Sequence, residues 1–197
     1  MLARILETEA TTGTMITTTN SAAISLDGAQ TFSVQCGVDV KTPAGTTFTA
    51  DNTTETFTAA NHGYTTGLKV QVSNSGGALP SGLSAATDYF VIVMTANTFR
   101  LATSLANALA GTNLLIADDG TGTQTITPTA LAGATVALQK SNDGVTWAAE
   151  GVSTPITGDA TFFLEKVDPS ARYMRVSYTI TAGSMSATHY ILCKGEI

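Results

Sequence analysis

Charged residues are scarce in this sequence: only 12% of its 197 residues are Asp, Glu, Lys or Arg. The formal net charge is −6, and the 9 lysines and arginines stand singly along the chain. A surface that binds nucleic acid needs clustered positive charge to replace the counterions of the phosphates. We therefore expect no nucleic-acid partner.

Long hydrophobic runs are also missing. No run approaches the ~18 apolar residues that a membrane-spanning helix needs. The N-terminal segment MLARILETEATTG lacks the continuous apolar core and the small-residue cleavage site of a secretory signal peptide. We expect a soluble protein that is made in the cytoplasm and has no membrane partner.

Cysteine and histidine are rare, with 2 of each. Cys36 and Cys193 could form a disulfide if their strands are neighbours, but two cysteines in a chain without a secretion signal are more often buried thiols. There is no CxxC motif or Cys/His cluster to bind a metal, and no glycine-rich loop has the spacing of a nucleotide-binding motif. We expect no metal and no cofactor.

Neither histidine lies in a catalytic motif. His62 is in an Asn-His-Gly turn, where its ring can cap the loop, and His189 is in a predicted strand with no second histidine near it in sequence. A general base needs a nucleophile within hydrogen-bonding reach, and the sequence suggests none. We predict that the protein is not an enzyme and has no catalytic residue.

Two loops and one aromatic residue have both a structural and a binding interpretation. The acidic loop at residues 118–122 faintly resembles a calcium-binding loop, but the further acidic ligands are missing, so a turn is favoured. Residues 142–144 contain the hairpin-turn dipeptide Asp-Gly. Trp147, the only tryptophan, could stack on a sugar, although a lone tryptophan beside alternating strand residues more often fills a sandwich core.

The sequence does contain a strong β pattern. Threonine is the commonest residue, and its branched Cβ suits strands. Apolar residues alternate with polar or small ones over residues 31–40, and five further strand segments with regular turns follow residue 128. The two arms together supply roughly seven strands, about what an antiparallel β-sandwich needs, whereas neither arm could close a core alone.

The segment between the arms has a different character, with short strands, Gly/Pro loops and one short helix at SLANALAG. We predict a mainly all-β fold in which this β-rich module, residues 51–128, is inserted into an outer antiparallel β-sandwich domain formed by residues 21–50 and 129–197. Residues 1–20 are expected to form a short helix followed by an extended N-terminal arm. The terminus could simply be mobile; alternatively, Leu2, Arg4, Ile5 and Leu6 are candidate partner-binding residues that would dock on a neighbouring subunit.

The inserted module resembles a known family. FTAANHGYTTGLKVQV and LPSGLSAATDYFVIVMTANTFRLATSLANALAGT keep the spacing of three blocks, FT…NHG…TG…V, LP.GL…T.Y.V and TF.LA.S…A..G. Over most of residues 57–127 they resemble a module that recurs in virion proteins of tailed bacteriophages. In the second arm, QKSNDGVTWAAEG and LEKVDPSARYMRVSYT are similar to β-sandwich domains of phage capsid-associated and tail-associated proteins.

The resemblance implies a non-enzymatic viral structural protein in the virion of a bacteriophage. We expect a capsid decoration or cement protein that binds the outside of the shell and stabilises capsomer junctions. Its partners would be the major capsid protein or other virion proteins, and by analogy it would be a homo-oligomer, with a trimer expected.

Two alternatives stay open at this point. One is a tail, neck or fibre-associated virion protein, and the other is an adhesin module that binds a receptor or a carbohydrate. An exposed pair of aromatic side chains would favour the adhesin, whereas a buried Trp147 would favour assembly.

Overall fold

The protein is described here from a computed structural model, which places residues 3–26, 31–40, 43–167, 170–181 and 183–194. The fold is all-β apart from one short helix, as the sequence predicted. The chain divides into two compact units, Met1–Lys41 with Leu131–Ile197, and Thr42–Ala130. In the described residues, no helix is both long and apolar enough to cross a membrane.

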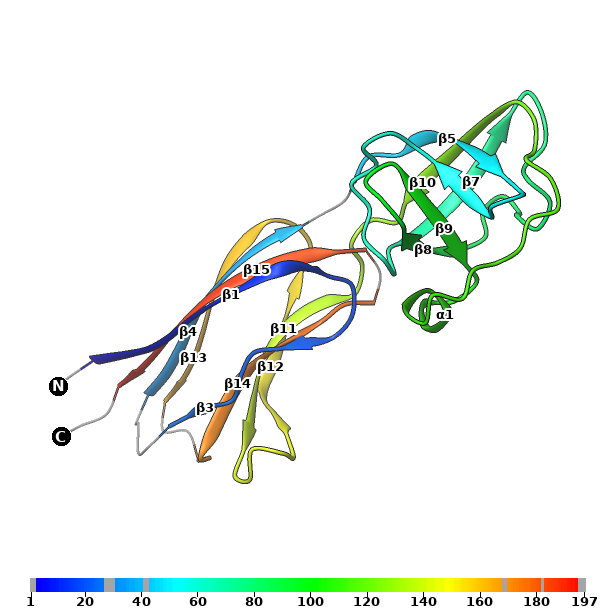
Figure 1. The fold of residues 1–197 in the computed structure, drawn as a ribbon. Helices are drawn as coiled ribbons and strands as arrows, with labels where there is room; N and C mark the ends of the chain where they lie inside the picture. The colour runs from blue at the N-terminus through cyan, green and yellow to red at the C-terminus, as the bar shows by residue number, and fades with distance from the viewer. Residues whose placement is uncertain (1–2, 27–30, 41–42, 168–169, 182, 195–197) are drawn as a thin grey trace. The chain divides into compact units, whose positions relative to one another are not determined.

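The first unit contains a four-stranded antiparallel sheet (Figure 1). Its order is β1 (Ala3–Met15), β15 (Met185–Lys194), β4 (Thr31–Val40) and β13 (Ala160–Val167). The strands β1 and β15 come from the two ends of the chain and pair along most of their length. The sheet therefore brings both termini of the described chain together.

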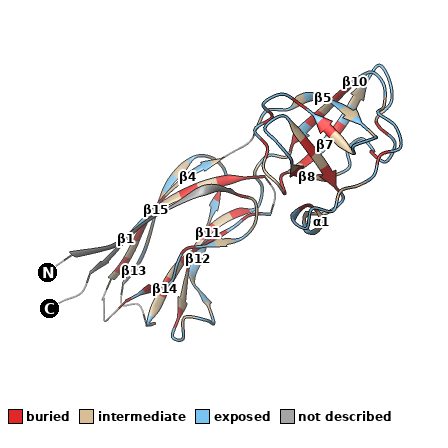
Figure 2. Ribbon diagram, viewed as in Figure 1, coloured by how far each residue is buried: buried red, intermediate tan, exposed pale blue. Residues whose placement is uncertain are grey.

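A second sheet of five strands completes this unit. Its order is β12 (Ala148–Ile156), β11 (Ala134–Ser141), β14 (Tyr173–Thr179) and β2 (Thr19–Asn20), and β3 (Ile24–Ser25) also pairs with β14. Both sheets contribute to one hydrophobic cluster, and buried residues line their strands (Figure 2). From the four-stranded sheet this cluster includes Phe32, Val34, Cys36, Val38, Met185 and Ala187; from the five-stranded sheet it includes Val136, Leu138, Ile156, Met174, Val176 and Tyr178.

The alternation over residues 31–40 accounts for the burial in β4. Every second side chain, from Phe32 to Val38, is buried, and the residues between them face away from the cluster. A period of two residues is what a strand with one buried face requires. The strand and its buried face could thus be predicted from sequence.

The second unit is a closed six-stranded barrel (Figure 1). Its order is β10 (Thr123–Pro128), β5 (Thr46–Asp51), β6 (Thr56–Thr58), β9 (Thr98–Ala102), β8 (Tyr89–Val93) and β7 (Lys69–Ser75), and β7 pairs with β10 to close it. Aromatic rings fill part of its interior. The rings of Phe57 and Phe99 are stacked with centroids 5.6 Å apart, and Phe48 meets Phe57 edge-on at 5.5 Å.

A single helix, α1 (Leu105–Leu109), lies where SLANALAG predicted one. The side chain of Ser104 caps its first turn by accepting the N–H of Asn107 at 3.1 Å. Gly111 follows the helix with φ +73°, a left-handed conformation that glycine adopts without strain. Ala108 packs with Ile92 and Ala102 in a small cluster of its own.

The prediction that the N-terminal residues form a short helix followed by an extended arm is wrong. Residues 3–15 form strand β1, which pairs with β15 from Ala3↔Lys194 to Met15↔Met185. Met15 is buried in the shared cluster with 5% of its surface exposed. The apolar residues near the N-terminus suggested a helix, but the pairing partner lies about 180 residues away in sequence, and no local pattern reports it.

The expected boundaries of the inserted module also differ from the structure. We placed residues 46–50 in the outer domain, but β5 pairs with β10 and β6 of the barrel. The barrel unit accordingly spans residues 42–130 rather than 51–128. Its two ends lie side by side, because Thr46 pairs with Ile126.

Candidate functional site

One candidate surface is the side of the four-stranded sheet that faces away from the hydrophobic cluster, which we call the outer face. Alternation along the strands assigns to it the side chains between the buried ones. Its described residues on β4, β13 and β15 are Ser33, Gln35, Gly37, Asp39, Thr161, Phe163, Glu165, Ser186, Thr188 and Tyr190. Hydroxyl and small side chains dominate it.

A depression of about 530 Å³ lies on this sheet around Gly37. Gly37 stands between Thr161 on β13 and Thr188 on β15 in the strand register. Because glycine has no side chain, the outer face is recessed at Gly37, between the side chains of Thr161 and Thr188 on the neighbouring strands. Asp39 and Asp159 also line the depression, and Asp159 Oδ1 accepts the backbone N–H of Val40 at 2.7 Å.

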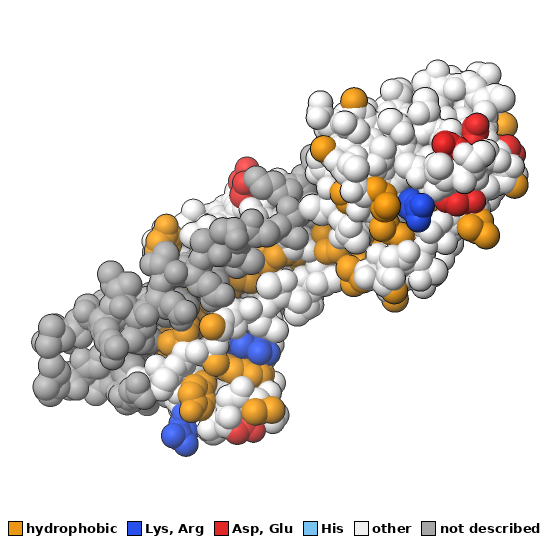
Figure 3. Space-filling view, viewed as in Figure 1, with side chains coloured by type: hydrophobic (Ala, Val, Ile, Leu, Met, Phe, Trp, Pro, Cys, Tyr) orange, Lys and Arg blue, Asp and Glu red, His pale blue; other side chains and the backbone are white. Residues whose placement is uncertain are grey.

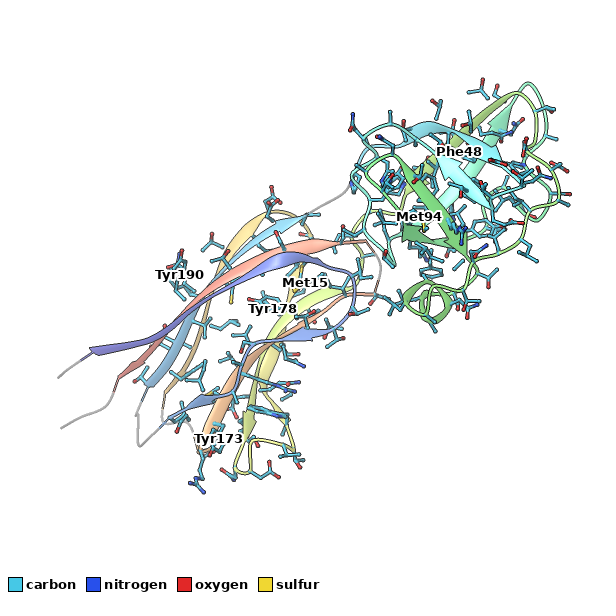
Figure 4. The ribbon with its side chains drawn as sticks, viewed as in Figure 1. Met15, Phe48, Met94, Tyr173, Tyr178 and Tyr190 are labelled. Carbon is cyan, nitrogen blue, oxygen red and sulfur yellow. The ribbon has the colours of Figure 1, made fainter. Side chains whose placement is uncertain are left out.

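Two large aromatic side chains stand next to the depression. Phe163 is 72% exposed and Tyr190 is 50% exposed. Both are paired with Gln35, one on each side of β4, so their backbones lie two strand spacings apart, about 10 Å. In Figure 4 Tyr190 lies on the side of the sheet away from Tyr178, which is buried in the cluster.

This exposed aromatic pair was not identified from the sequence, although a signal for Phe163 existed. In TFFLEKV two phenylalanines are adjacent, and neighbouring side chains in a strand point to opposite faces. Phe162 packs against the cluster, so Phe163 has to face outwards. Nothing local distinguished Tyr190, because its exposure depends on the pairing of β15 with β1 and β4.

The acidic loops that faintly resembled ligand sites are used to hold backbone in place. Asp118 Oδ1 accepts the N–H groups of Ser81 at 3.1 Å and Gly120 at 2.9 Å, which lowers the pKa of that carboxyl. Asp119 Oδ1 accepts the N–H of Asn52 at 2.7 Å. These contacts confirm the turn interpretation.

The hairpin loop after β11 is held in the same way. Asp143 Oδ1 accepts the N–H groups of Thr146 at 2.7 Å and Val145 at 2.8 Å, and these two bonds lower the pKa of the carboxyl. Among the described residues, no group of three or more His, Cys, Asp or Glu side chains could hold a metal ion.

His62 has a structural environment in the barrel unit. Its Nδ1 accepts the N–H of Tyr64 at 3.0 Å, so Nε2 carries the proton and donates it to the carbonyl oxygen of Thr95 at 3.1 Å. The ring stacks on Tyr64 with centroids 4.7 Å apart and meets Phe99 edge-on. Both ring nitrogens are occupied, which confirms that His62 caps its loop. The backbone of His189 lies in β15, but its side chain is outside the described residues.

Trp147 does not fill the core, so that interpretation is wrong. It is half-buried just before β12, an edge strand whose residues are mostly exposed. The guanidinium carbon of Arg175 lies 4.2 Å from the centre of the indole ring, and Arg175 Nε donates to Gln139 Oε1 at 2.8 Å. One face of Trp147 is therefore covered by a cation rather than by apolar side chains.

The two cysteines cannot pair. Cys36 lies opposite His189, whereas Cys193 lies opposite Phe32, so the two are offset by four residues, about 13 Å along the strands. A disulfide requires Cα atoms less than about 7 Å apart. Cys36 is a buried free thiol, and burial raises its pKa.

Three of the predicted partner-binding residues, Arg4, Ile5 and Leu6, lie in β1 at the far edge of the same sheet. Leu2 is outside the described residues, and of Arg4, Ile5 and Leu6 only the backbone is described. Arg4 pairs with Cys193 and Ile5 with Leu192, and the register shifts between Ile5 and Glu7. These residues thus belong to a strand rather than to a free arm.

Comparisons with known proteins leave the chain unassigned: no family model, no curated protein and no solved structure matches it.

Proposed function

We propose that this chain is a non-enzymatic structural protein of a bacteriophage virion, a decoration or cement protein that binds the outside of the capsid shell and stabilises capsomer junctions. The observation that carries the proposal is the outer face, a broad surface of small and hydroxyl side chains beside exposed Phe163 and Tyr190. Aromatic residues are enriched where proteins contact one another. The resemblance of residues 57–127 to a phage virion module supplies the context.

The two sheets that share one cluster are, in this proposal, a β-sandwich that serves as the attachment domain. Figure 3 shows few charged side chains, in small separate groups, on the visible described surface. Contacts made by such a surface depend less on salt than ion pairs do. Each contact forms only on the assembled particle, so many copies together stabilise the particle by mass action and multivalency.

The acidic loops and the histidine loop considered from the sequence support a role without catalysis. Asp118 and Asp119 accept backbone N–H groups of neighbouring segments, Asp143 accepts those of its own loop, and both nitrogens of His62 are bonded to backbone. Groups that hold loops in this way are not available to exchange protons with a substrate. The partners in this proposal are the major capsid protein or other virion proteins.

The attachment proposal can be tested with particles that lack the protein. Purified protein is added and co-sedimented with the particles, and we expect Tyr190→Ser to reduce the bound fraction about tenfold, as loss of a contact aromatic does. Val152→Ser is the matched control, because Val152 is 91% exposed on the other sheet. Absence of wild-type binding, or an equal loss in both variants, would contradict the proposal.

A second candidate function, an adhesin, is favoured by the same exposed aromatic pair and by the position of Trp147 outside the core, the two observations that were expected to separate it from assembly. Phe163 and Tyr190 flank Gln35, and hydroxyls and two carboxylates, Asp39 and Asp159, line the depression beside them. Aromatic faces pack on the C–H groups of a sugar while hydroxyl and carboxylate oxygens bond its hydroxyls. An adhesin would bind a neutral glycan here, and a glycan array probed with wild type and Tyr190→Ser separates the two functions. Glycan binding lost in Tyr190→Ser would favour the adhesin.

A further inference from the structure

We propose that the free edge of β13 pairs with the same edge of a second copy of this chain, so that two four-stranded sheets join into one sheet across a two-fold axis. Within the described residues, β13 is the last strand of its sheet and pairs only with β4. An unpaired edge offers a row of backbone N–H and C=O groups to any strand that can align with it.

The other edge of the same sheet, β1, is irregular. Its pairing with β15 shifts register between Ile5 and Glu7 and again between Thr11 and Met15. Such bulges twist a strand and break the regular spacing that another strand would need. The edge at β1 is thus poorly suited to pairing.

The edges of the five-stranded sheet are also protected. The pairing of β12 with β11 shifts register between Val136 and Leu138 of β11. Within β12, Gly151 has φ +77°, and Pro155 cannot donate a backbone hydrogen bond. On the other side, the edge is formed by β2 and β3, which have two residues each. Short strands, bulges and proline are the devices by which proteins prevent edge pairing.

β13 is neither short nor bulged and contains no proline, although it does carry the charged residues Glu165 and Lys166. Its eight residues, ATFFLEKV, pair with β4 without a register shift, and they include neither glycine nor proline. Phenylalanine and β-branched residues favour strand pairing. Among the four edges of the two sheets, the edge at β13 is long and regular, and it carries an exposed aromatic residue, Phe163.

The sequence of β13 is complementary to itself in one antiparallel register. With the two-fold axis at Phe163, the two Phe163 side chains are opposite each other on the outer face, and Thr161 lies opposite Glu165 of the second copy. On the inner face Phe162 lies opposite Leu164, and both are only partly buried in a single copy. This register joins aromatic to aromatic and apolar to apolar, and it sets no like charges opposite each other among these five residues.

This self-complementarity favours a second copy of the chain as the partner of the β13 edge, because a two-fold contact uses the same self-complementary surface on both copies. Pairing of one strand buries less area than a standard interface, so the dimer is weak in solution. On a particle that carries many copies, the same contact is strengthened by effective concentration. The two-fold contact also differs from the trimer that we expected by analogy.

Sedimentation velocity of the purified full chain tests the proposal. We expect the wild-type protein to shift from monomer towards dimer between about 1 and about 200 µM. Phe163→Lys sets two like charges opposite each other and removes the aromatic pair, so the dissociation constant should rise about tenfold or more. Val152→Lys, a change at the exposed edge strand β12, is the matched control and should leave it unchanged.

Thr161→Lys tests the register itself. The new lysine would lie opposite Glu165 of the second copy twice in each dimer, so the dissociation constant should fall about threefold to tenfold. Because Thr161 is exposed and pairs with Gly37 within the chain, the change leaves the fold intact. A wild type that stays monomeric, a trimer, or a dimer that responds to neither substitution would overturn the proposal. Self-association needs no particle, so this result is independent of the attachment test.

Discussion

At the level of single residues, the polar side chains that the sequence offered for chemistry serve to shape loops. His62 is the clearest example, because one ring satisfies the N–H of Tyr64 and the carbonyl of Thr95 while it packs on Phe99. The Asn-His-Gly turn could be predicted from sequence. The two bonds to the ring could not, because Thr95 approaches from a separate loop.

We expect His62→Ala to lower the free energy of unfolding of the barrel unit by about 2–4 kcal/mol, because one buried and one partly buried backbone group lose their partner and a cavity forms. Urea unfolding followed by tyrosine fluorescence measures the change. Thr58→Ala, at an exposed position on β6, is the control and should stay within about 0.5 kcal/mol. Equal stability of the two variants would show that the histidine is dispensable.

Asp118 gives a prediction for pH. Its pKa is lowered from 3.8 in the folded protein by the N–H groups of Ser81 and Gly120. A carboxyl with a depressed folded pKa stabilises the fold fully above its unfolded pKa, and this contribution disappears as pH falls through the folded pKa. Wild-type stability should therefore fall more steeply below about pH 4 than that of Asp118→Asn. The free energies of unfolding of both proteins are measured by urea titration between about pH 5 and about pH 2. If the two free energies change with pH in parallel, this account is contradicted.

At the level of elements, local pattern identified β4 and helix α1. It failed for β1 and β5. The partner of β1 is at the opposite end of the chain, and β5 was assigned to the outer domain because the resemblance began after it. Tyr190 on the outer face was missed for a related reason, since its exposure depends on the strands that lie on either side of β15.

The structure makes Met15 a test of whether β1 is a structural strand. Met15 is 5% exposed and pairs with buried Met185, so Met15→Ala should destabilise the first unit by about 2–4 kcal/mol. Met94→Ala is the matched control, because Met94 is 52% exposed in the barrel unit and its loss should cost less than about 0.5 kcal/mol. Chemical denaturation of both variants gives the comparison, and an unaffected Met15→Ala would restore the arm interpretation.

The same result changes how attachment by the N-terminal residues should be studied. Deleting residues 1–20 would remove strands β1 and β2 and a buried methionine, so a loss of binding could reflect unfolding. Substitution of Arg4 changes only a side chain and leaves the backbone pairing of β1 in place, so it tests attachment without removing the strand. The partner-binding role of Leu2, Arg4, Ile5 and Leu6 stays a prediction.

At the level of the whole molecule, the blocks that carry the phage resemblance are folding determinants of the barrel. Phe57, Val70, Tyr89 and Phe99 are buried in its interior. In the second block, a Cβ on Gly82 would lie 2.6 Å from the carbonyl oxygen of Leu115, so only glycine fits there. The spacing therefore identifies a fold module, and it does not by itself mark a binding site.

The barrel should be separable from the rest of the chain. Each unit has its own hydrophobic cluster, and the two ends of the barrel lie side by side at Thr46 and Ile126. We expect removal of residues 42–130, with a short Gly/Ser linker in their place, to leave the first unit folded with its unfolding midpoint within about 5 °C. Calorimetry checks this, and a product without a cooperative transition would show that the two units depend on each other.

The central claim, decoration of a capsid shell, is tested most directly by the number of copies of this protein in each purified particle. Quantitative mass spectrometry against the major capsid protein gives that number. Decoration predicts on the order of hundreds of copies, because every capsomer junction offers a site. About a dozen copies or fewer would place the protein at the tail or neck instead, and absence from particles would contradict a virion role altogether.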